Sequence, residues 1–323
     1  MTYAIQAEGL VKRFGKTTAV AGVDLSVRPG TVFGLLGPNG AGKTTVVRML
    51  ATLLRPDAGT ASVDGFDIVT DANDVRARIG LTGQYAAVDE DLTGFENLLM
   101  IGRLLEIPRR EAKQRARDLL DRFDLAEAGG RSTKTYSGGM RRRLDLAASL
   151  VSTPKILFLD EPTTGLDPRS RGDVWSMVRE LVAEGTTVLL TTQYLDEADR
   201  LANEIAVIDH GTVIASGTSA ELKAKVGGQT LDVRPTDPED LPRVAGIVTA
   251  AVGKPPASTA EDPGLLSVAV DDPQALPTVV ARLQSDGIAV TELALRLASL
   301  DEVFLALTGR PAAEEPETTK GKK

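Results

Sequence analysis

The sequence predicts an α/β protein: a domain built on a mostly parallel sheet, with a helical insertion, followed by a small C-terminal α/β domain. Two observations indicate this class. From the N-terminus to about Gly227, apolar runs of strand length alternate with amphipathic helical segments, a pattern typical of parallel sheets covered by helices. After Gly227-Gly228 a shorter alternation follows. We therefore assign residues 1–227 and 228–309 to the two domains, and we expect the tail, 310–323, to be disordered because its only apolar residues are alanines.

Three largely apolar runs are expected to form central strands, because strands buried on both faces lack a polar alternation. They are Val32–Leu36, residues 156–159 and Thr187–Thr192. A helix is expected to follow the first run and to end near Leu53. Asp167 and Pro168 are typical of an N-cap and a first helical turn, and they precede the third strand. Apolar residues at helical spacing predict the buried face of that helix: Val174, Met177, Val178, Leu181 and Val182.

The segment of about residues 85–136 has no strand signal and two helical signals. One helix is expected near residues 96–105. The second follows Pro108 and gathers its apolar residues on one face. These residues are Ala112, Ala116, Leu119, Leu120 and Phe123. We interpret the segment as a helical insertion between two strands of the sheet domain.

The remaining elements follow from turn and capping signals. Asp209-His210-Gly211 is expected to join residues 205–208 and 212–215 as a hairpin, and Thr218 with Glu221 predicts a capping box for the next helix. In the C-terminal domain the predicted strands are 230–234, 265–270 and 288–293. The predicted helices are 242–252, 277–285 and 300–307, the last of them capped by Ser299 and Glu302.

The composition excludes several classes of function. The chain has no cysteine, which excludes disulfides and thiolate catalysis, and a single histidine, His210, which argues against histidine metal clusters. A general base is therefore expected to be a carboxylate. The net charge of −8 argues against a nucleic-acid partner, because nucleic-acid-binding surfaces are basic. No run approaches the roughly 20 apolar residues of a membrane span, and charged residues interrupt the N-terminus, so a cytosolic start is expected.

Residues 37–44, Gly-Pro-Asn-Gly-Ala-Gly-Lys-Thr, match the P-loop pattern between a predicted strand and a predicted helix. The glycines allow backbone N–H groups to approach phosphates, and the helix adds the positive end of its dipole. Lys43 is expected to reach the β- and γ-phosphates, and the Thr44 hydroxyl to help hold Mg²⁺. An accidental glycine-rich turn is disfavoured by the strand–loop–helix context. The residues expected to bind the nucleotide are Gly37, Pro38, Asn39, Gly40, Ala41, Gly42, Lys43, Thr44 and Thr45.

Two acids, Asp160 and Glu161, follow the apolar strand 156–159, and ligands of open α/β sheets bind at the carboxyl ends of strands. Asp160 is expected to hold Mg²⁺, and Glu161 to orient and deprotonate the attacking water. Alone, such a pair is more often a solvated strand end. Downstream of a P-loop it indicates a nucleotide hydrolase, so the fold is expected to be that of a P-loop NTPase.

Tyr136-Ser137-Gly138-Gly139-Met140 precedes a helix whose inner face carries Leu144, Ala147, Ala148 and Val151. The Ser137 hydroxyl and the free N–H groups of Gly138 and Gly139 make a second anion site at a helix N-terminus. An ordinary N-cap is the commoner use of Ser-Gly. A second phosphate site in a chain with one P-loop suggests that it serves the nucleotide of another copy.

In these segments the chain resembles the nucleotide-binding subunits of ABC transporters, over roughly residues 2–227. Residues 37–44 match the Walker A motif, 137–139 the signature, 156–161 the Walker B motif with its catalytic glutamate, and 165–167 the D-loop. The resemblance implies that Gln84 contacts Mg²⁺ and signals to the membrane subunit, and that Phe14 stacks on adenine. It also implies a homodimer in which two ATP molecules lie between the Walker A motif of one subunit and the signature of the other.

The chain departs from that family at three positions. Tyr136 and Met140 replace the leucine and glutamine that flank Ser-Gly-Gly, and Gln193 stands where the family has its switch histidine. Gln193 can hydrogen-bond a phosphate or water but cannot carry a proton. His210 lies in a predicted hairpin turn and is expected to be a surface residue. Gln193 is therefore expected to fill the switch position, and Glu161 to be the sole base.

Residues 193–199, Gln-Tyr-Leu-Asp-Glu-Ala-Asp, the small C-terminal domain and residues 300–304 are similar to the ATPase subunits of daunorubicin/doxorubicin-resistance exporters. This resemblance implies an integral-membrane permease partner, a peripheral position on the cytoplasmic face of the cell membrane, and export of a hydrophobic drug or antibiotic. Two alternatives stay open: a soluble ABC-type ATPase acting on ribosomes or DNA, and a nucleotide-gated binding module that hydrolyses slowly.

Overall fold

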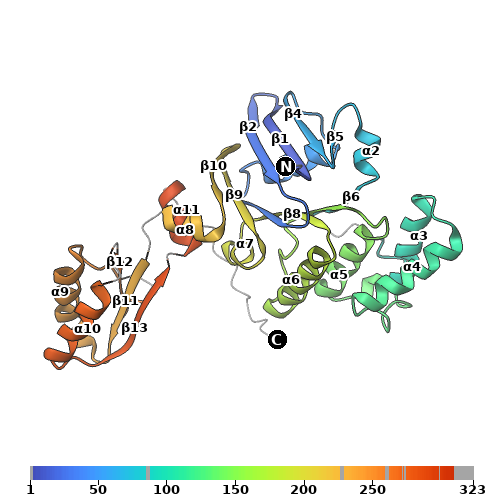
Figure 1. The fold of residues 1–323 in the computed structure, drawn as a ribbon. Coiled ribbons are helices and arrows are strands. Elements are labelled where there is room, and N and C mark those ends of the chain that lie inside the picture. The colour runs from blue at the N-terminus through green and yellow to red at the C-terminus, as the bar shows by residue number, and fades with distance from the viewer. Residues whose placement is uncertain are drawn as a thin grey trace. The chain divides into compact units, whose positions relative to one another are not determined.

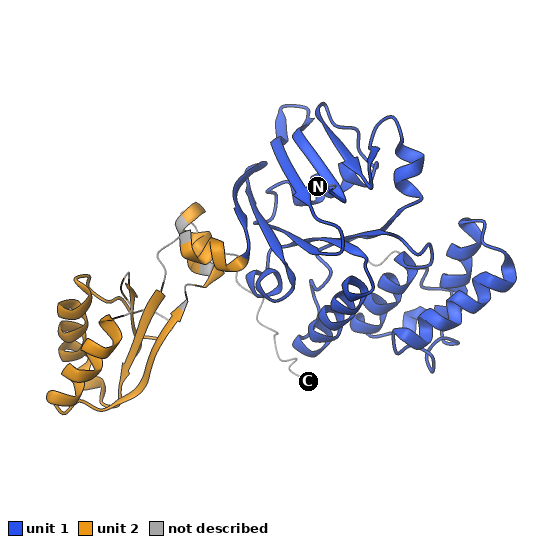
Figure 2. Ribbon diagram, viewed as in Figure 1, with its two compact units in different colours: residues 1–218, 312–323 blue, residues 219–311 orange. Residues whose placement is uncertain are grey.

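The computed structural model describes residues 3–84, 88–225, 229–258, 262–270, 272, 274–297 and 299–308. It divides into two compact units, residues 1–218 with 312–323 and residues 219–311 (Figure 2). The boundary predicted at 227/228 and the predicted disordered tail, 310–323, lie outside the described residues. Among the helices of the described ranges, none has the length and apolar character needed to cross a bilayer.

The first unit is built around a six-stranded sheet in the order β10-β9-β3-β8-β7-β6 (Figure 1). Neighbouring strands from β9 through β6 are parallel, and β10 pairs antiparallel with β9 through the predicted hairpin. Every residue of β3, β7 and β8 is buried, which confirms the three predicted central strands. The strands are β3 Val32–Leu36, β6 Ile79–Thr82, β7 Ile156–Asp160, β8 Thr187–Thr192, β9 Glu204–Asp209 and β10 Thr212–Gly217.

Alternate residues of the central strands belong to two hydrophobic cores. In β7, Ile156 and Phe158 belong to a core shared with α1, whereas Leu157 and Leu159 belong to a core shared with α5 and α6. Asp167 caps α6 by accepting hydrogen bonds from two backbone N–H groups, as predicted. The helices of this unit outside the insertion are α1 Lys43–Leu50, α2 Ala72–Arg76, α5 Gly138–Ser149, α6 Pro168–Ala183 and α7 Leu195–Leu201.

The buried face of α6 is narrower than the predicted stripe. Val174, Val178 and Leu181 are buried, whereas Met177 and Val182 are partly buried and pack against the same core. The first helix is also shorter than expected: α1 ends at Leu50, before the predicted end at Leu53, which is 59% exposed.

A four-stranded antiparallel sheet accompanies the parallel one, in the order β2-β1-β4-β5. The alternation of strands and helices did not predict this second sheet. Its strands are β1 Ile5–Phe14, β2 Thr17–Val27, β4 Ala58–Val63 and β5 Phe66–Asp67. Strand β2 approaches the P-loop, because a Cβ atom on Gly42 would lie 2.4 Å from the carbonyl oxygen of Ala19.

The insertion between β6 and β7 is helical, as predicted. It contains α3 Gly94–Leu104, α4 Arg109–Arg122 and the 3-10 turn Thr133–Thr135. Helix α3 begins with a capping box in which Thr93 and Glu96 bond each other's backbone N–H groups. Four of the five residues expected on the inner face of the second helix are buried, and Leu119 is half-buried.

The second unit contains the antiparallel sheet β12-β11-β13. Its elements are α8 Ser219–Lys225, β11 Gln229–Pro235, the 3-10 turn Pro238–Asp240, α9 Leu241–Val252, β12 Leu266–Val270, α10 Ala275–Ser285, β13 Val290–Leu297 and α11 Leu300–Thr308. The last strand begins later than predicted, because Gly287 has a left-handed backbone and Ile288 belongs to the preceding turn. Ser299 and Glu302 form the predicted capping box, with N···O distances of 2.9 and 3.2 Å.

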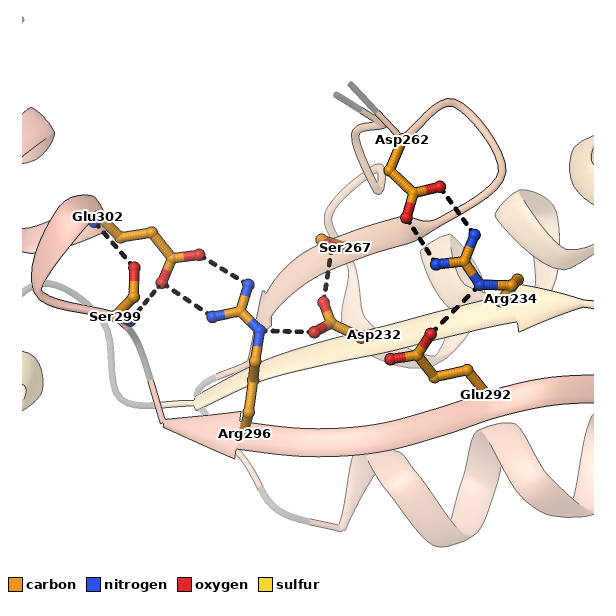
Figure 3. A network of polar contacts seen from close by, with 8 residues as sticks. All are labelled: Asp232, Arg234, Asp262, Ser267, Glu292, Arg296, Ser299 and Glu302. Atoms are coloured by element: carbon orange, nitrogen blue, oxygen red, sulfur yellow. Dashed lines mark hydrogen bonds and ion pairs between the residues drawn. The ribbon is translucent and has the colours of Figure 1, made fainter. Parts of the chain in front are cut away.

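The two faces of this three-stranded sheet differ in character. One face packs against α9 and α10 through residues such as Leu231, Val233 and Val268. The other face is polar and charge-paired (Figure 3). There, Arg296 lies 2.5 Å from Asp232 and 2.9 Å from Glu302, and Arg234 lies 2.6 Å from Asp262 and 3.2 Å from Glu292. On this face, ion pairs therefore join side chains of the neighbouring strands β11 and β13.

Candidate nucleotide-binding site

The P-loop between β3 and α1 has a backbone that only glycine tolerates at two positions. A Cβ atom on Gly37 would lie 2.2 Å from the carbonyl oxygen of Ile208, and Gly42 combines φ +104° with a Cβ that would lie 2.4 Å from the carbonyl oxygen of Ala19. The N–H group of Gly37 donates to the carbonyl oxygen of Thr192 at 3.2 Å. The loop is thus packed tightly against neighbouring strands on one side.

A cavity of about 370 Å³ lies against this loop. Its volume is within the range of small-molecule binding sites. Residues from distant parts of the sequence meet there, as predicted for a nucleotide site, and Ala19 joins them without having been predicted. The lining consists of Phe14, Ala19, Asn39, Gly40, Gly42, Lys43, Thr44, Thr45, Gln84 and Glu161.

Pro38 and Ala41 belong to the predicted loop but do not line the cavity, whereas Phe14 lies at its rim. Pro38 offers its carbonyl oxygen to Lys43, and Ala41 is 2% exposed in the hydrophobic core. Phe14 ends β1 and is 49% exposed, so it is not a core residue. An exposed ring at the rim of a cavity can stack on a flat ligand.

Lys43 is buried at the base of the cavity. Its Nζ donates to the carbonyl oxygens of Gly37 at 2.8 Å and Pro38 at 3.1 Å, and it lies 3.2 Å from Glu161 Oε1. Burial lowers the pKa of Lys43, and the nearby carboxylates of Glu161 and Asp160 act in the opposite direction. The ammonium group is therefore placed where an incoming anion would relieve its desolvation.

Asp160 ends β7 and is 4% exposed. Its Oδ1 accepts hydrogen bonds from the hydroxyl groups of Thr44 at 3.1 Å and Thr191 at 2.6 Å. Thr44 and Asp160, which were each predicted to help hold Mg²⁺, are thus in direct contact. Thr191 was not predicted, although two successive threonines at the end of a fully buried strand are a signal for it.

Glu161 is 6% exposed and has a left-handed backbone with φ +50°. Its Oε2 accepts hydrogen bonds from Gln84 Nε2 and from the Thr164 hydroxyl, each at 3.3 Å. Non-glycine residues rarely adopt this conformation, which is concentrated at functional sites. The carboxylate therefore lies between Lys43 on one oxygen and Gln84 on the other.

The residues around Thr44 have the chemistry that Mg²⁺ requires. Mg²⁺ prefers oxygen ligands and usually takes one or two carboxylates together with phosphate oxygens and water. The Thr44 hydroxyl and the Asp160 carboxylate are adjacent, and the Gln84 amide lines the same cavity. Within the described ranges, no group of three or more acidic or histidine side chains could hold a metal alone. The Thr44 hydroxyl and the Asp160 carboxylate could therefore supply part of the ligand set of a Mg²⁺ ion bound with a nucleotide.

Ser137, Gly138 and Gly139 lie at the N-terminus of α5, and none of them lines the cavity. The Ser137 hydroxyl accepts a hydrogen bond from the N–H of Met140 at 3.2 Å, which is the ordinary capping contact. Ser137 and Gly138 are exposed. A role for this helix end toward a second nucleotide stays a prediction.

Two departures noted in the sequence have structural counterparts. Tyr136 is 3% exposed and donates its hydroxyl proton to the carbonyl oxygen of Ala128 at 2.8 Å, which joins the signature segment to the helical insertion. Gln193 follows β8, and its Oε1 is enclosed without a hydrogen-bond partner. Gln193 does not line the cavity. The side chain of His210 is 75% exposed, as expected for a surface residue.

The fold and the site together define a class of protein. A family model described as ABC transporter matches residues 20–164. The structure is similar to that of an ATP-binding cassette of an ABC transporter in its ADP conformation, with a TM-score of 0.63, 28% identity, and coverage of 68% of this chain and 93% of that one. It is also similar to CbiO1 from Clostridium perfringens, with a TM-score of 0.64, 26% identity, and coverage of 70% and 92%. The chain is an ABC-type ATPase that binds nucleotide.

The family within this class follows from relatives that align over nearly the whole chain. A second family model, the C-terminal domain of DrrA1-3-like ATP-binding proteins, matches residues 217–308. The chain is 56% identical to the daunorubicin/doxorubicin resistance ATP-binding protein DrrA of Streptomyces peucetius, over 96% of this chain and 94% of that one. Identity is 45% to the doxorubicin resistance protein DrrA of Mycobacterium tuberculosis strain H37Rv, over 95% and 94%. The chain belongs to the DrrA-like family of ABC transporter ATP-binding subunits.

A more distant group of relatives is named for export. The chain is 42% identical to the Nod factor export ATP-binding protein I of Ralstonia nicotianae, over 96% of this chain and 95% of that protein. The relatives named for resistance and for export thus align across both units of this chain. The alternative of a soluble ATPase acting on ribosomes or DNA is therefore not favoured.

Proposed function

We propose that the chain is the ATP-hydrolysing subunit of an exporter for a hydrophobic drug or antibiotic. It acts as a homodimer with a separate integral-membrane permease, at the cytoplasmic face of the cell membrane. The observation that carries the proposal is the gathering of Lys43, Gln84 and Glu161 with the P-loop around one cavity. The names of the DrrA relatives support the class of cargo.

In this proposal Glu161 is the general base. Its Oε2 receives hydrogen bonds from Gln84 and Thr164, which fix the carboxylate, and its Oε1 faces Lys43. A nucleotide phosphate competes for the ammonium group of Lys43. Once Lys43 is drawn toward the phosphate, Glu161 is free to accept a proton from the attacking water. The ion pair between Lys43 and Glu161 is thus replaced by a contact of Lys43 with the phosphate and a contact of Glu161 with the attacking water.

The Thr44 hydroxyl and Asp160 would hold Mg²⁺, whose positive charge offsets the charge of the phosphates when it is bound. Phe14 supplies the exposed ring for the base, and residues 39–45 supply the loop for the phosphates. Gln193 takes the switch position, where its amide can orient water or phosphate but cannot transfer a proton.

The proposal requires a second copy because the signature lies away from the cavity of its own chain. The N-terminus of α5, at Ser137, is exposed and carries the free N–H groups and the dipole that favour an anion. Two copies placed head to tail would bring this helix end to the phosphates in the other subunit's P-loop.

Glu161→Gln tests the base and the dimer together. We expect turnover to fall at least about 100-fold, as for the loss of a general base, and ATP to trap a dimer detectable by size-exclusion chromatography with light scattering. Glu106→Gln is a matched control, because Glu106 is also a glutamate with a left-handed backbone, φ +61°, but is exposed and lies outside the cavity. A Glu161→Gln protein that stays monomeric with ATP would contradict the dimer, and one with normal turnover would contradict the base.

The exporter is tested separately in membranes. The chain should co-purify with a permease from membranes of cells that express both, and daunorubicin or doxorubicin should stimulate ATP turnover of that complex. Turnover that neither drug changes, in a complex that still hydrolyses ATP, would remove the cargo class while leaving the ATPase assignment in place.

A further inference from the structure

The hydroxyl group of Thr191 is fully buried near the end of β8, beside the two acids of the site. Every residue of β8 is buried, and Thr191 is 0% exposed. In the parallel register of β7 and β8, Thr191 lies opposite Asp160. A hydroxyl group in such an interior is unfavourable unless both its donor and its acceptor capacity are used. Here both are used on residues of the candidate site.

The Thr191 hydroxyl forms two hydrogen bonds. It donates to Asp160 Oδ1 at 2.6 Å, and it accepts from the backbone N–H of Glu161 at 3.1 Å. The same N–H also lies 3.1 Å from the carbonyl oxygen of Thr191. One residue of β8 thus contacts the side chain of one acid and the backbone of the next. These contacts coincide with the left-handed backbone of Glu161, where a single orientation must be held against strain.

The contact with Asp160 matters most when the site binds a cation. Asp160 Oδ1 also accepts the Thr44 hydroxyl at 3.1 Å. If Thr44 bound Mg²⁺ through its oxygen, its O–H could still donate to Asp160, and the shorter bond from Thr191 would restrain the same carboxylate from a second side chain. Hydrogen-bond partners of this kind orient metal-binding carboxylates and raise the metal affinity or the activity of the site.

We propose that Thr191 is a positioning residue for ATP hydrolysis, which orients the Asp160 carboxylate and the backbone of Glu161 through one hydroxyl group. This inference rests on the roles proposed above for Asp160 and Glu161. It extends the site to a residue that does not line the nucleotide cavity.

Thr191→Val tests the inference because it keeps the branched shape and removes the hydroxyl. We expect kcat to fall about 10- to 100-fold, the effect typical of removing such a partner. Thr191→Ser keeps the hydroxyl and should restore most of kcat. Thr191→Cys, close in size to serine with a weak donor, should fall between the serine and valine variants.

Metal binding gives a readout that does not depend on turnover. Mn²⁺ is titrated with a non-hydrolysable ATP analogue, and free Mn²⁺ is followed by electron paramagnetic resonance. Thr191→Val should weaken Mn²⁺ binding about 10-fold or more, and Thr191→Ser should not. Thr187→Val is the matched control: Thr187 is buried in the same strand, but its hydroxyl accepts from the N–H of Gly30 at 2.9 Å, at the opposite end. We expect this control to retain normal kcat and Mn²⁺ affinity.

Four results would overturn the inference. These are normal kcat and Mn²⁺ affinity in Thr191→Val, an equal loss of kcat in Thr187→Val, no rescue by serine, or a cysteine variant as active as the serine variant. The serine and cysteine variants decide the question if Thr191→Val does not fold. Failure of the proposed function would look different, because Glu161→Gln would then retain turnover whatever residue stands at position 191.

Discussion

The two arginines on the polar face of the C-terminal sheet allow a prediction with an internal control. Arg296 and Arg234 lie on neighbouring strands, and each is paired with two acids (Figure 3). Their partners differ in burial: Asp232 is 4% exposed, whereas the side chains of Asp262 and Glu292 are 41% and 46% exposed. Arg296→Met should therefore destabilise this unit much more than Arg234→Met.

The expected magnitude follows from the charge that is left behind. Removing one partner of a buried ion pair costs about 3–5 kcal/mol, because the other charge stays buried without compensation. The Arg296 side chain is 38% exposed, so solvent screens part of the interaction, and Ser267 still donates to Asp232 at 2.6 Å. We therefore expect Arg296→Met to lower the stability of this unit by about 2 kcal/mol.

The assay must report on the second unit itself. The only tryptophan in the sequence, Trp175, lies in α6 of the first unit, so its fluorescence would miss the change. Hydrogen–deuterium exchange of peptides from β11, β12 and β13 measures the opening of this sheet directly. A loss of about 2 kcal/mol corresponds to exchange about 30-fold faster in Arg296→Met.

A double variant tests the reason as well as the size. Asp232→Asn in the Arg296→Met background removes the stranded charge and keeps an acceptor for Ser267, so most of the protection should return. Equal acceleration in Arg296→Met and Arg234→Met would refute the argument from burial. A double variant no better protected than Arg296→Met would show that lost packing, and not a stranded charge, causes the effect.

Two further predictions concern the first unit. Lys43→Ala should weaken nucleotide binding about 10- to 100-fold, since a charge-assisted contact to phosphate is lost; unchanged affinity for a fluorescent ATP analogue would contradict the site. Burial raises the pKa of Glu197 in the folded protein. The free energy of unfolding therefore falls as pH rises above about 4.3, the ordinary pKa of a glutamate, and stops falling once pH has passed the raised pKa. Glu197→Gln removes this decline, and tryptophan-monitored urea unfolding at pH 5 and pH 8 measures it; an equal pH dependence in both proteins would contradict the assignment.

Local patterns predicted the central strands and the P-loop. Val32–Leu36 and Thr187–Thr192 are buried on both faces, so their apolar character identified them without knowledge of their partners. The P-loop was likewise predicted from neighbouring residues, because a phosphate-binding loop requires glycine at fixed positions, here Gly37 and Gly42. The family resemblance added Gln84 and Phe14, which line the cavity although the residues alone did not point to them.

Long-range pairings were not predictable in the same way. The antiparallel sheet depends on β1 pairing with β4, about 50 residues along the chain, and its strands lack the long apolar runs of the central ones. Thr191 was missed because its role depends on contacts with Asp160, the last residue of β7, and with Glu161, which follows that strand. The charge pairs of Asp232 and Arg296 likewise depend on the register of β11 with β13.

The left-handed backbone of Glu161 has a consequence for how this position can vary. Glycine would occupy that conformation without the roughly 1–3 kcal/mol of strain that a side chain brings. A change from glutamate to glycine would remove that strain, but it would also leave the buried ammonium group of Lys43, 3.2 Å away, without its carboxylate partner, at a cost of about 3–5 kcal/mol. The ion pair thus outweighs the strained backbone, so glutamate at this position serves the stability of the chain as well as turnover.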